Sequence, residues 1–102
     1  MKPCIVIDID GTWSAFRSLL EPLYNDSWYV NIPCIFASAR EQPLDKLQRI
    51  LPSNAIFISA LNGQSKFQAV VAAGWQPMMW IDNEPWTIAP ERNIKTPDDS
   101  LL

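Results

Sequence analysis

The sequence predicts an α/β domain: a three-layer α/β/α sandwich built on a parallel sheet of four to five strands. Two observations lead to this prediction. Short apolar runs recur along the 102 residues, each of the kind expected for a strand buried on both faces of a parallel sheet. Helical patterns lie between these runs, so strand and helix alternate as in right-handed βαβ crossovers. With 48% hydrophobic residues the chain can bury one modest core, and we expect a single domain over residues 1–102.

The predicted strands are four continuous apolar runs and one weaker candidate. The runs read CIVID, PCIFAS, AIFIS and MMWID, at residues 4–8, 33–38, 55–59 and 78–82. Residues 93–96 are the candidate for a short fifth strand. Cys4 and Cys34 fall within the first two runs, which favours buried free thiols over a disulfide between them.

Three helical patterns connect the strands. The first, over residues 14–25, is the weakest, because we expect Pro22 to interrupt it. The second, over 43–52, places its leucine and isoleucine side chains on one face and ends at a proline. The third, over 65–74, has a similar apolar spacing and ends on Gly74, a residue type favoured just after a helix.

Absences in the composition narrow the chemistry. The chain has no histidine, which excludes Ser-His and Cys-His catalysis and His-containing zinc sites. Its three glycines are far apart, which excludes a P-loop and a dinucleotide fingerprint. The net charge of −3 argues against a duplex nucleic-acid surface. No apolar run approaches the ~20 residues of a membrane span, and no signal pattern is present, so we expect no membrane partner and a cytoplasmic protein.

Polar residues stand at the carboxyl ends of the predicted strands. They are Asp8 and Asp10 after the first strand, then Ser38, Ser59 and Asp82. Because ligands of open parallel sheets bind outside these strand ends, we expect the side chains to converge on one crevice. Two carboxylates roughly 4 Å apart repel each other by about 4 kcal/mol at an effective dielectric near 20. The sequence therefore predicts a positive charge between them.

These residues resemble the motifs of the haloacid dehalogenase (HAD) superfamily. IVIDIDGT is similar to its first motif, a strand ending in DxDGT. CIFAS, ending at Ser38, is similar to the second motif, and Lys66, opening a helix after the third strand, is similar to the third. MMWIDNEP is similar to the fourth, a strand that ends in acidic residues. The four occur in order along most of the chain.

The resemblance implies an Mg²⁺-dependent phosphohydrolase that acts on a phosphomonoester through an aspartyl-phosphate intermediate. Asp8 would be the nucleophile, and Asp10 would protonate the leaving oxygen and then activate water. Mg²⁺ would be held by Asp8, the main-chain carbonyl of Asp10, and Asp82. The residues expected to bind the phosphoryl group are Thr12, Ser38 and Lys66.

The sequence differs from the pattern of this family in two places. Many members carry a second aspartate directly after the acid of the fourth motif, where this chain has Asn83 and then Glu84. The intervals between the motifs leave no room for a cap domain. A capless member has an open site, so we expect a bulky phosphorylated substrate or a lid from a neighbouring subunit of a homo-oligomer.

Residues beside the motifs are candidate substrate contacts. They are Trp13, Arg40, Asn83 and Glu84. Trp13 follows the first motif and Trp86 the fourth, so both indoles could flank the mouth of the site, although packing is the favoured role for any one tryptophan. Arg40 could grip a distal phosphate, and its alternative is a solvated loop arginine.

Two other functions are consistent with the sequence. The chain could be a catalytically weak or inactive relative that binds a nucleotide, a phosphoprotein or a protein partner in the same crevice. Asn83, the missing cap and the five tryptophans motivate this alternative. The other is 3′-phosphatase action on single-stranded nucleic acid, which the acidic balance makes less attractive.

Overall fold

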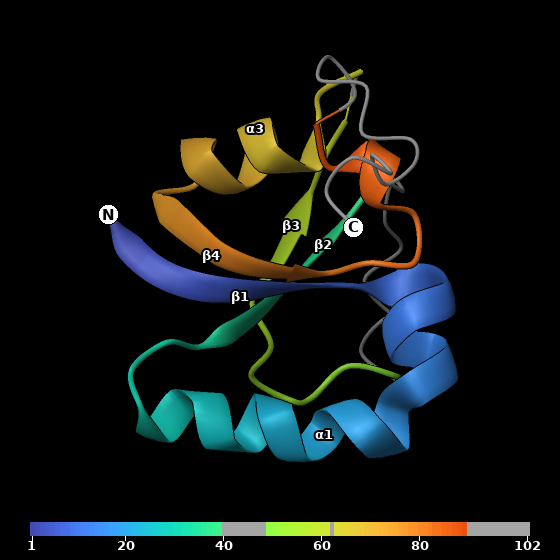
Figure 1. Cartoon of the computed structure of the whole chain (residues 1–102), viewed down its shortest axis with the longest axis vertical. Coiled ribbons are helices and arrows are strands. Elements are labelled where there is room, and N and C mark those ends of the chain that lie inside the picture. The colour runs from blue at the N-terminus through green and yellow to red at the C-terminus, as the bar shows by residue number, and fades with distance from the viewer. Residues whose placement is uncertain (40–48, 62, 90–102) are drawn as a thin grey trace, which may run out of the picture.

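The computed structural model describes residues 1–39, 49–61 and 63–89, which fold around a four-stranded sheet (Figure 1). Neighbouring strands all pair in parallel, in the order β3-β2-β1-β4. The strands are β1 (Lys2–Asp8), β2 (Cys34–Ser38), β3 (Phe57–Ser59) and β4 (Trp75–Ile81). The four predicted strands and their parallel pairing are confirmed, although β4 begins at Trp75 rather than at residue 78.

A described helix covers each face of the sheet: α1 (Ser14–Tyr29) lies on one side and α3 (Lys66–Ala72) on the other (Figure 1). This arrangement is compatible with a Rossmann-like sandwich. The described helices include none that is long and apolar enough to cross a membrane. Most of the predicted helix over 43–52 lies outside the described residues, as do Arg40 and the strand candidate at 93–96.

α1 continues through Pro22, so the prediction of an interruption there is wrong. A proline inside a helix removes a hydrogen-bond donor and costs ~3 kcal/mol. Burial of the inner face offsets this cost, because Tyr24 belongs to the core and Leu20 and Leu23 pack against it. Pro22 itself is exposed on the outer face of the helix.

Alternate residues of β1 and β2 fill an apolar cluster on each face of the sheet. Ile7 and Phe36 face the cluster that α1 covers. Val6 and Ile35 face the cluster that α3 covers. All residues of β2 are buried, as its continuous apolar run predicts.

Cys4 and Cys34 are buried free thiols, as predicted. Burial, together with the nearby Cys34, raises the pKa of Cys4 to about 11. Burial also raises the pKa of Cys34. Both thiols therefore stay protonated at neutral pH and act as small apolar side chains in the core.

Trp13 is a core residue and does not lie at the mouth of a site, so packing, the role favoured for the tryptophans, is confirmed for it and the possible substrate contact is wrong. Its side chain is 0% exposed. The ring packs edge-on against Phe36 and Tyr24, with centroids 5.0 and 6.1 Å away. Its indole N–H donates to the main-chain oxygen of Ile50 at 2.6 Å. Packing and this hydrogen bond account for Trp13, because a buried indole needs both apolar neighbours and an acceptor.

Candidate functional site

The site is centred on Asp8, the last residue of β1. Asp8 is only 7% exposed. Its Oδ1 accepts a hydrogen bond from Lys66 Nζ at 3.0 Å, and its Oδ2 accepts one from Thr12 Oγ1 at 3.3 Å. Burial raises the pKa of Asp8, while the hydrogen bond from Lys66 acts in the opposite direction. The carboxylate is thus fixed at both oxygens, by α3 and by the turn that follows β1.

Lys66, the first residue of α3, supplies the positive charge of the site. A capping box fixes the start of the helix: the Ser65 hydroxyl accepts from the Gln68 N–H, and the Gln68 side chain accepts from the Ser65 N–H. Lys66 Nζ donates to Asp8 Oδ1 at 3.0 Å and to Asp82 Oδ2 at 2.7 Å. Burial would lower the pKa of Lys66, but its bonds to Asp82 and Asp8 raise it above the usual value.

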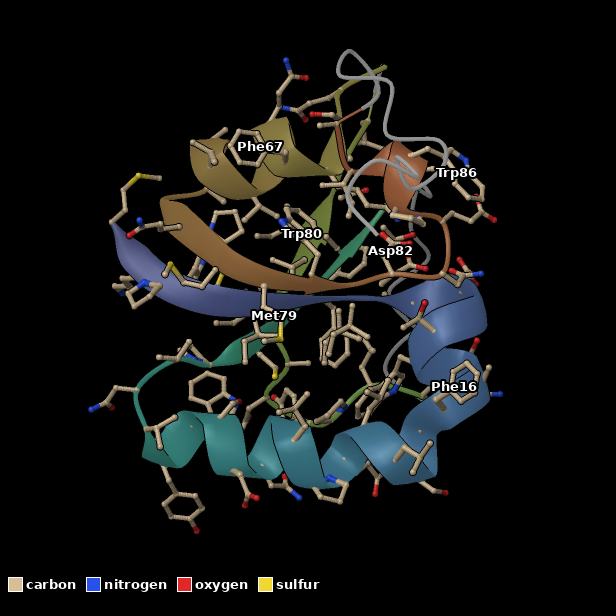
Figure 2. The ribbon with its side chains drawn as sticks, in the orientation of Figure 1. Phe16, Phe67, Met79, Trp80, Asp82 and Trp86 are labelled. Carbon is tan, nitrogen blue, oxygen red and sulfur yellow. The ribbon has the colours of Figure 1, made fainter. Side chains whose placement is uncertain are left out.

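Asp82, directly after β4, turns both of its oxygens toward protein donors. Oδ2 accepts from Lys66, and Oδ1 accepts from the main-chain N–H of Glu84 at 2.9 Å. Figure 2 shows Asp82 at the end of β4, on the side of the sheet that α3 covers. The positive charge predicted at the carboxyl ends of the strands is therefore supplied in part by the Lys66 ammonium, which forms ion pairs with both Asp8 and Asp82.

A second set of contacts joins the turn after β1 to Asn83. Thr12 Oγ1 accepts from the main-chain N–H of Asn83 at 3.0 Å. The Asn83 amide satisfies its neighbours when Nδ2 points at Asp8 Oδ2, 2.9 Å away. In that orientation Nδ2 is also 3.1 Å from Thr12 Oγ1 and from the main-chain oxygen of Asp10. The opposite orientation places Oδ1 at this point, where Thr12 Oγ1 donates to it at 3.1 Å.

Gly11 allows the Asn83 amide to come this close. Its φ of +78° lies in the left-handed region that glycine adopts without strain. A Cβ at this position would stand 2.5 Å from the outer atom of the Asn83 amide, which is Oδ1 when Nδ2 points at Asp8 and Nδ2 in the opposite orientation; this is shorter than any normal contact. The glycine of the first motif therefore serves both the turn and the packing of the amide.

A cavity of about 320 Å³ opens beside Asp8. Its described lining consists of Asp8, Asp10, Ser38, Ala39, Lys66, Glu84 and Thr87. Ligand sites usually enclose about 300 to 1,000 Å³. The cavity therefore has room for a phosphoryl group and a small part of the molecule that carries it.

The predicted site residues fall into two sets. Those that line the cavity are Asp8, Asp10, Ser38, Lys66 and Glu84. Those that stand behind it are Thr12, Asp82 and Asn83. Thr12 is 4% exposed, and its hydroxyl is directed at Asp8 and Asn83 instead of the cavity. The first set can touch a ligand, and the second holds the first in position.

Thr87 lines the cavity although sequence reasoning missed it. It ends the short turn η2 (Pro85–Thr87), where its N–H and hydroxyl donate to the main-chain oxygen of Glu84 at 2.9 and 2.7 Å. Its closeness to the fourth motif was the only available signal. Trp86, beside it, is 41% exposed but does not line the cavity. Figure 2 shows Trp86 on the outer side of η2.

The oxygens around Asp8 are of the type that Mg²⁺ prefers. Asp8 Oδ2 and the main-chain oxygen of Asp10 face one point, the tip of the Asn83 amide. The third predicted ligand, Asp82, is directed at Lys66. Within residues 1–39, 49–61 and 63–89, no three His, Cys, Asp or Glu side chains are grouped to hold a metal. With the amide turned so that Oδ1 stands at this point, three oxygens would be available to a metal ion there: Asp8 Oδ2, the main-chain oxygen of Asp10 and Asn83 Oδ1.

Comparison with known proteins yields no relative. No family model matches the chain, and no curated protein or solved structure is significantly similar to it. The fold therefore defines only a broad class, an α/β domain with a four-stranded parallel sheet. Function has to be argued from the chemistry of the site.

Proposed function

We propose that this chain is a small, capless phosphohydrolase of the haloacid dehalogenase type, with the three-layer fold of that family, that hydrolyses a phosphomonoester with Mg²⁺. The observation that carries the proposal is the carboxylate of Asp8. It is nearly buried, fixed by Lys66 and Thr12, and it lines a cavity together with Ser38. A carboxylate held in this way is suited to nucleophilic attack on phosphorus.

The two aspartates of the first motif have different roles in the reaction: Asp8 is the nucleophile, and Asp10 is the general acid and then the general base. Asp8 attacks the phosphorus and forms an aspartyl-phosphate, while the bond from phosphorus to the leaving oxygen breaks. Asp10, on the wall of the same cavity, gives a proton to the leaving oxygen. Asp10 then takes a proton from a water molecule, which attacks the phosphorus and releases inorganic phosphate from Asp8.

Lys66 and Ser38 stabilise the charge of the transferring group. The Lys66 ammonium holds Asp8 and faces the cavity, so it also offsets the charge of the phosphoryl oxygens. The Ser38 hydroxyl donates a hydrogen bond to one of these oxygens. Mg²⁺, held by Asp8, the main-chain oxygen of Asp10 and Asn83, would neutralise the phosphoryl oxygens when bound.

The short intervals between the motifs imply that water is excluded by something other than a cap. A bulky phosphorylated substrate or a neighbouring subunit would supply this cover. We place the protein in the cytoplasm, where free thiols such as Cys4 and Cys34 stay reduced.

Replacement of the nucleophile tests the proposal. With Mg²⁺, the native chain should hydrolyse an aryl phosphate or another member of a phosphomonoester panel. Asp8→Asn should lower the rate by on the order of 10³-fold or more, and EDTA should abolish it. Asp26→Asn, the same change at an exposed position on α1, is the matched control and should leave the rate unchanged. A native chain that hydrolyses nothing in the panel would refute the proposal.

A second candidate function is a binding module without turnover. It is favoured by one observation: Asp82, the acid of the fourth motif, is directed at Lys66 and the N–H of Glu84 and is not grouped with Asp8 and Asp10 as a metal ligand. Thermal unfolding separates the candidates. Stabilisation by Mg²⁺ with a metal fluoride, which imitates a transferring phosphoryl group, supports the enzyme. Stabilisation only by an intact phosphorylated ligand, with no need for metal, supports the binding module.

A further inference from the structure

The tip of the Asn83 amide occupies a point that oxygen atoms surround. Three of them lie close to it: Asp8 Oδ2 at 2.9 Å, and Thr12 Oγ1 and the main-chain oxygen of Asp10 at 3.1 Å. Asp8 carries a negative charge when ionised, and a main-chain carbonyl can only accept hydrogen bonds. Whatever stands at this point must therefore donate hydrogen bonds or carry positive charge.

An amide nitrogen meets this requirement without a metal. Nδ2 carries two hydrogens, which can bond to the Asp8 carboxylate and to one of the other two oxygens. An oxygen at the same point would face two acceptors at hydrogen-bond distance with nothing between them, and such unpaired buried groups are costly.

We propose that the Asn83 amide donates hydrogen bonds to the Asp8 and Asp10 oxygens while the chain is metal-free, and turns over to offer Oδ1 as a ligand when Mg²⁺ binds beside it. The first half of this inference depends on the oxygens that surround the amide tip, because these assign Nδ2 to that point. The second half rests on the proposed function, because it needs the cation site of that proposal. Asn83 is then a switch in the site, in the position where many relatives of the resembled family carry an aspartate.

The geometry allows the amide to turn without movement of the main chain. Mg²⁺ has octahedral ligands at about 2.1 Å, so adjacent ligand oxygens lie about 3.0 Å apart. The separations from the Asn83 tip to Asp8 Oδ2 and to the Asp10 oxygen, 2.9 and 3.1 Å, match this value. Thr12 Oγ1 suits both orientations, since a hydroxyl accepts from Nδ2 in one and donates to Oδ1 in the other.

An aspartate at position 83 could not both donate hydrogen bonds in the metal-free chain and act as a ligand of Mg²⁺. Its carboxylate has no hydrogen to give, so in the metal-free chain it would face Asp8 as a like charge. With Mg²⁺ present, the same carboxylate would be a strong ligand. The amide therefore lets the chain fold before metal arrives, and a carboxylate would make folding depend on metal.

Thermal unfolding of the full chain tests the inference, with Asn83→Asp compared with the native protein in EDTA and in millimolar Mg²⁺. We expect Asn83→Asp to unfold about 10 °C below the native chain in EDTA, and to regain most of that difference in Mg²⁺. Asn25→Asp, the same change at an exposed position of α1, is the matched control and should be unaffected in either solution. Asn83→Ala should be destabilised in EDTA and should not recover in Mg²⁺.

An NMR measurement keeps the test valid if Asn83→Asp does not fold. The side-chain NH₂ signals of the native chain are recorded during titration with Mg²⁺. The signal of Asn83 should move on titration, while that of Asn25 stays in place. An Asn83 signal that does not respond to Mg²⁺ would overturn the switch.

The unfolding temperatures distinguish a failure of the inference about the Asn83 amide from a failure of the proposed cation site. Equal unfolding temperatures of Asn83→Asp and Asn25→Asp in EDTA would overturn the inference that the amide donates to the Asp8 and Asp10 oxygens. Destabilisation of Asn83→Asp without recovery in Mg²⁺ would support the amide contacts and overturn the cation site, and the proposed Mg²⁺-dependent function would fail with it. Recovery in Mg²⁺ without hydrolysis of any ester would support the switch and refute only the enzymatic proposal.

Discussion

At the scale of single residues, one ammonium serves two carboxylates. Lys66 is 5% exposed, with Asp8 and Asp82 as its partners. A buried ion pair contributes little net stability, because the loss of hydration offsets the attraction between the charges. Removing only the cation is different, since two carboxylates then stay in a site that can no longer compensate them.

We therefore expect Lys66→Met to lower the free energy of unfolding by about 3–5 kcal/mol, measured by urea denaturation at neutral pH. Arg17→Met is the control: it breaks an exposed pair with Glu21 on α1 and should cost less than about 0.5 kcal/mol. If the two variants are equally stable, Lys66 does not neutralise the site as described.

Sequence reasoning found the residues that stand at strand ends. Asp8 and Ser38 were predictable because continuous apolar runs mark where buried strands stop. For Trp13 the sequence favoured packing but left a substrate contact open, since its position beside a motif does not show which side of the turn the indole takes. The contacts of the Asn83 amide could not be predicted, because they depend on tenths of an ångström between segments far apart in the sequence.

At the scale of elements, the strands were easier to predict than the helices, although the predicted burial on both faces is wrong for β4, where Met78 and Met79 are exposed. A strand such as β2, buried along its whole length, leaves an unbroken apolar run. α1 is buried on one side only, and it contains Pro22, a residue type disfavoured in the interior of a helix. Burial of the apolar face of α1 stabilises the helix by more than the proline destabilises it. A local sequence pattern does not show how much tertiary packing contributes.

Pro22→Ala should therefore stabilise the protein. The change restores an N–H that can bond to the carbonyl of Ser18 and removes the clash of the proline ring. Because Pro22 is exposed, no core contact is lost, and we expect a gain of about 1–3 kcal/mol in thermal unfolding. Ser18→Ala, one turn earlier and also exposed, should change stability by less than about 0.5 kcal/mol. A less stable Pro22→Ala would show that the proline stabilises α1 and does not strain it.

At the scale of the whole molecule, the parallel sheet gathers distant segments at one edge. β1 and β4 are neighbours in the sheet, so Thr12 and Asn83 meet although 71 positions separate them in the sequence. Asp8, Ser38 and Lys66 line one cavity for the same reason. The site is therefore a property of the fold: its charged groups come from the end of β1 and the turn after it, from the start of α3, and from the segment that follows β4.

The most direct test is a crystal structure of the full chain grown with Mg²⁺ and beryllium fluoride, a mimic of a phosphoryl group attached to a carboxylate. We predict a beryllium fluoride group whose beryllium is bonded to a carboxylate oxygen of Asp8 and whose fluorides contact Lys66 and Ser38, beside an Mg²⁺ ion bound by Asp8 and the main-chain oxygen of Asp10. An Asp8 carboxylate that carries no such group, and is still held only by Lys66, Thr12 and the Asn83 amide, would contradict the account.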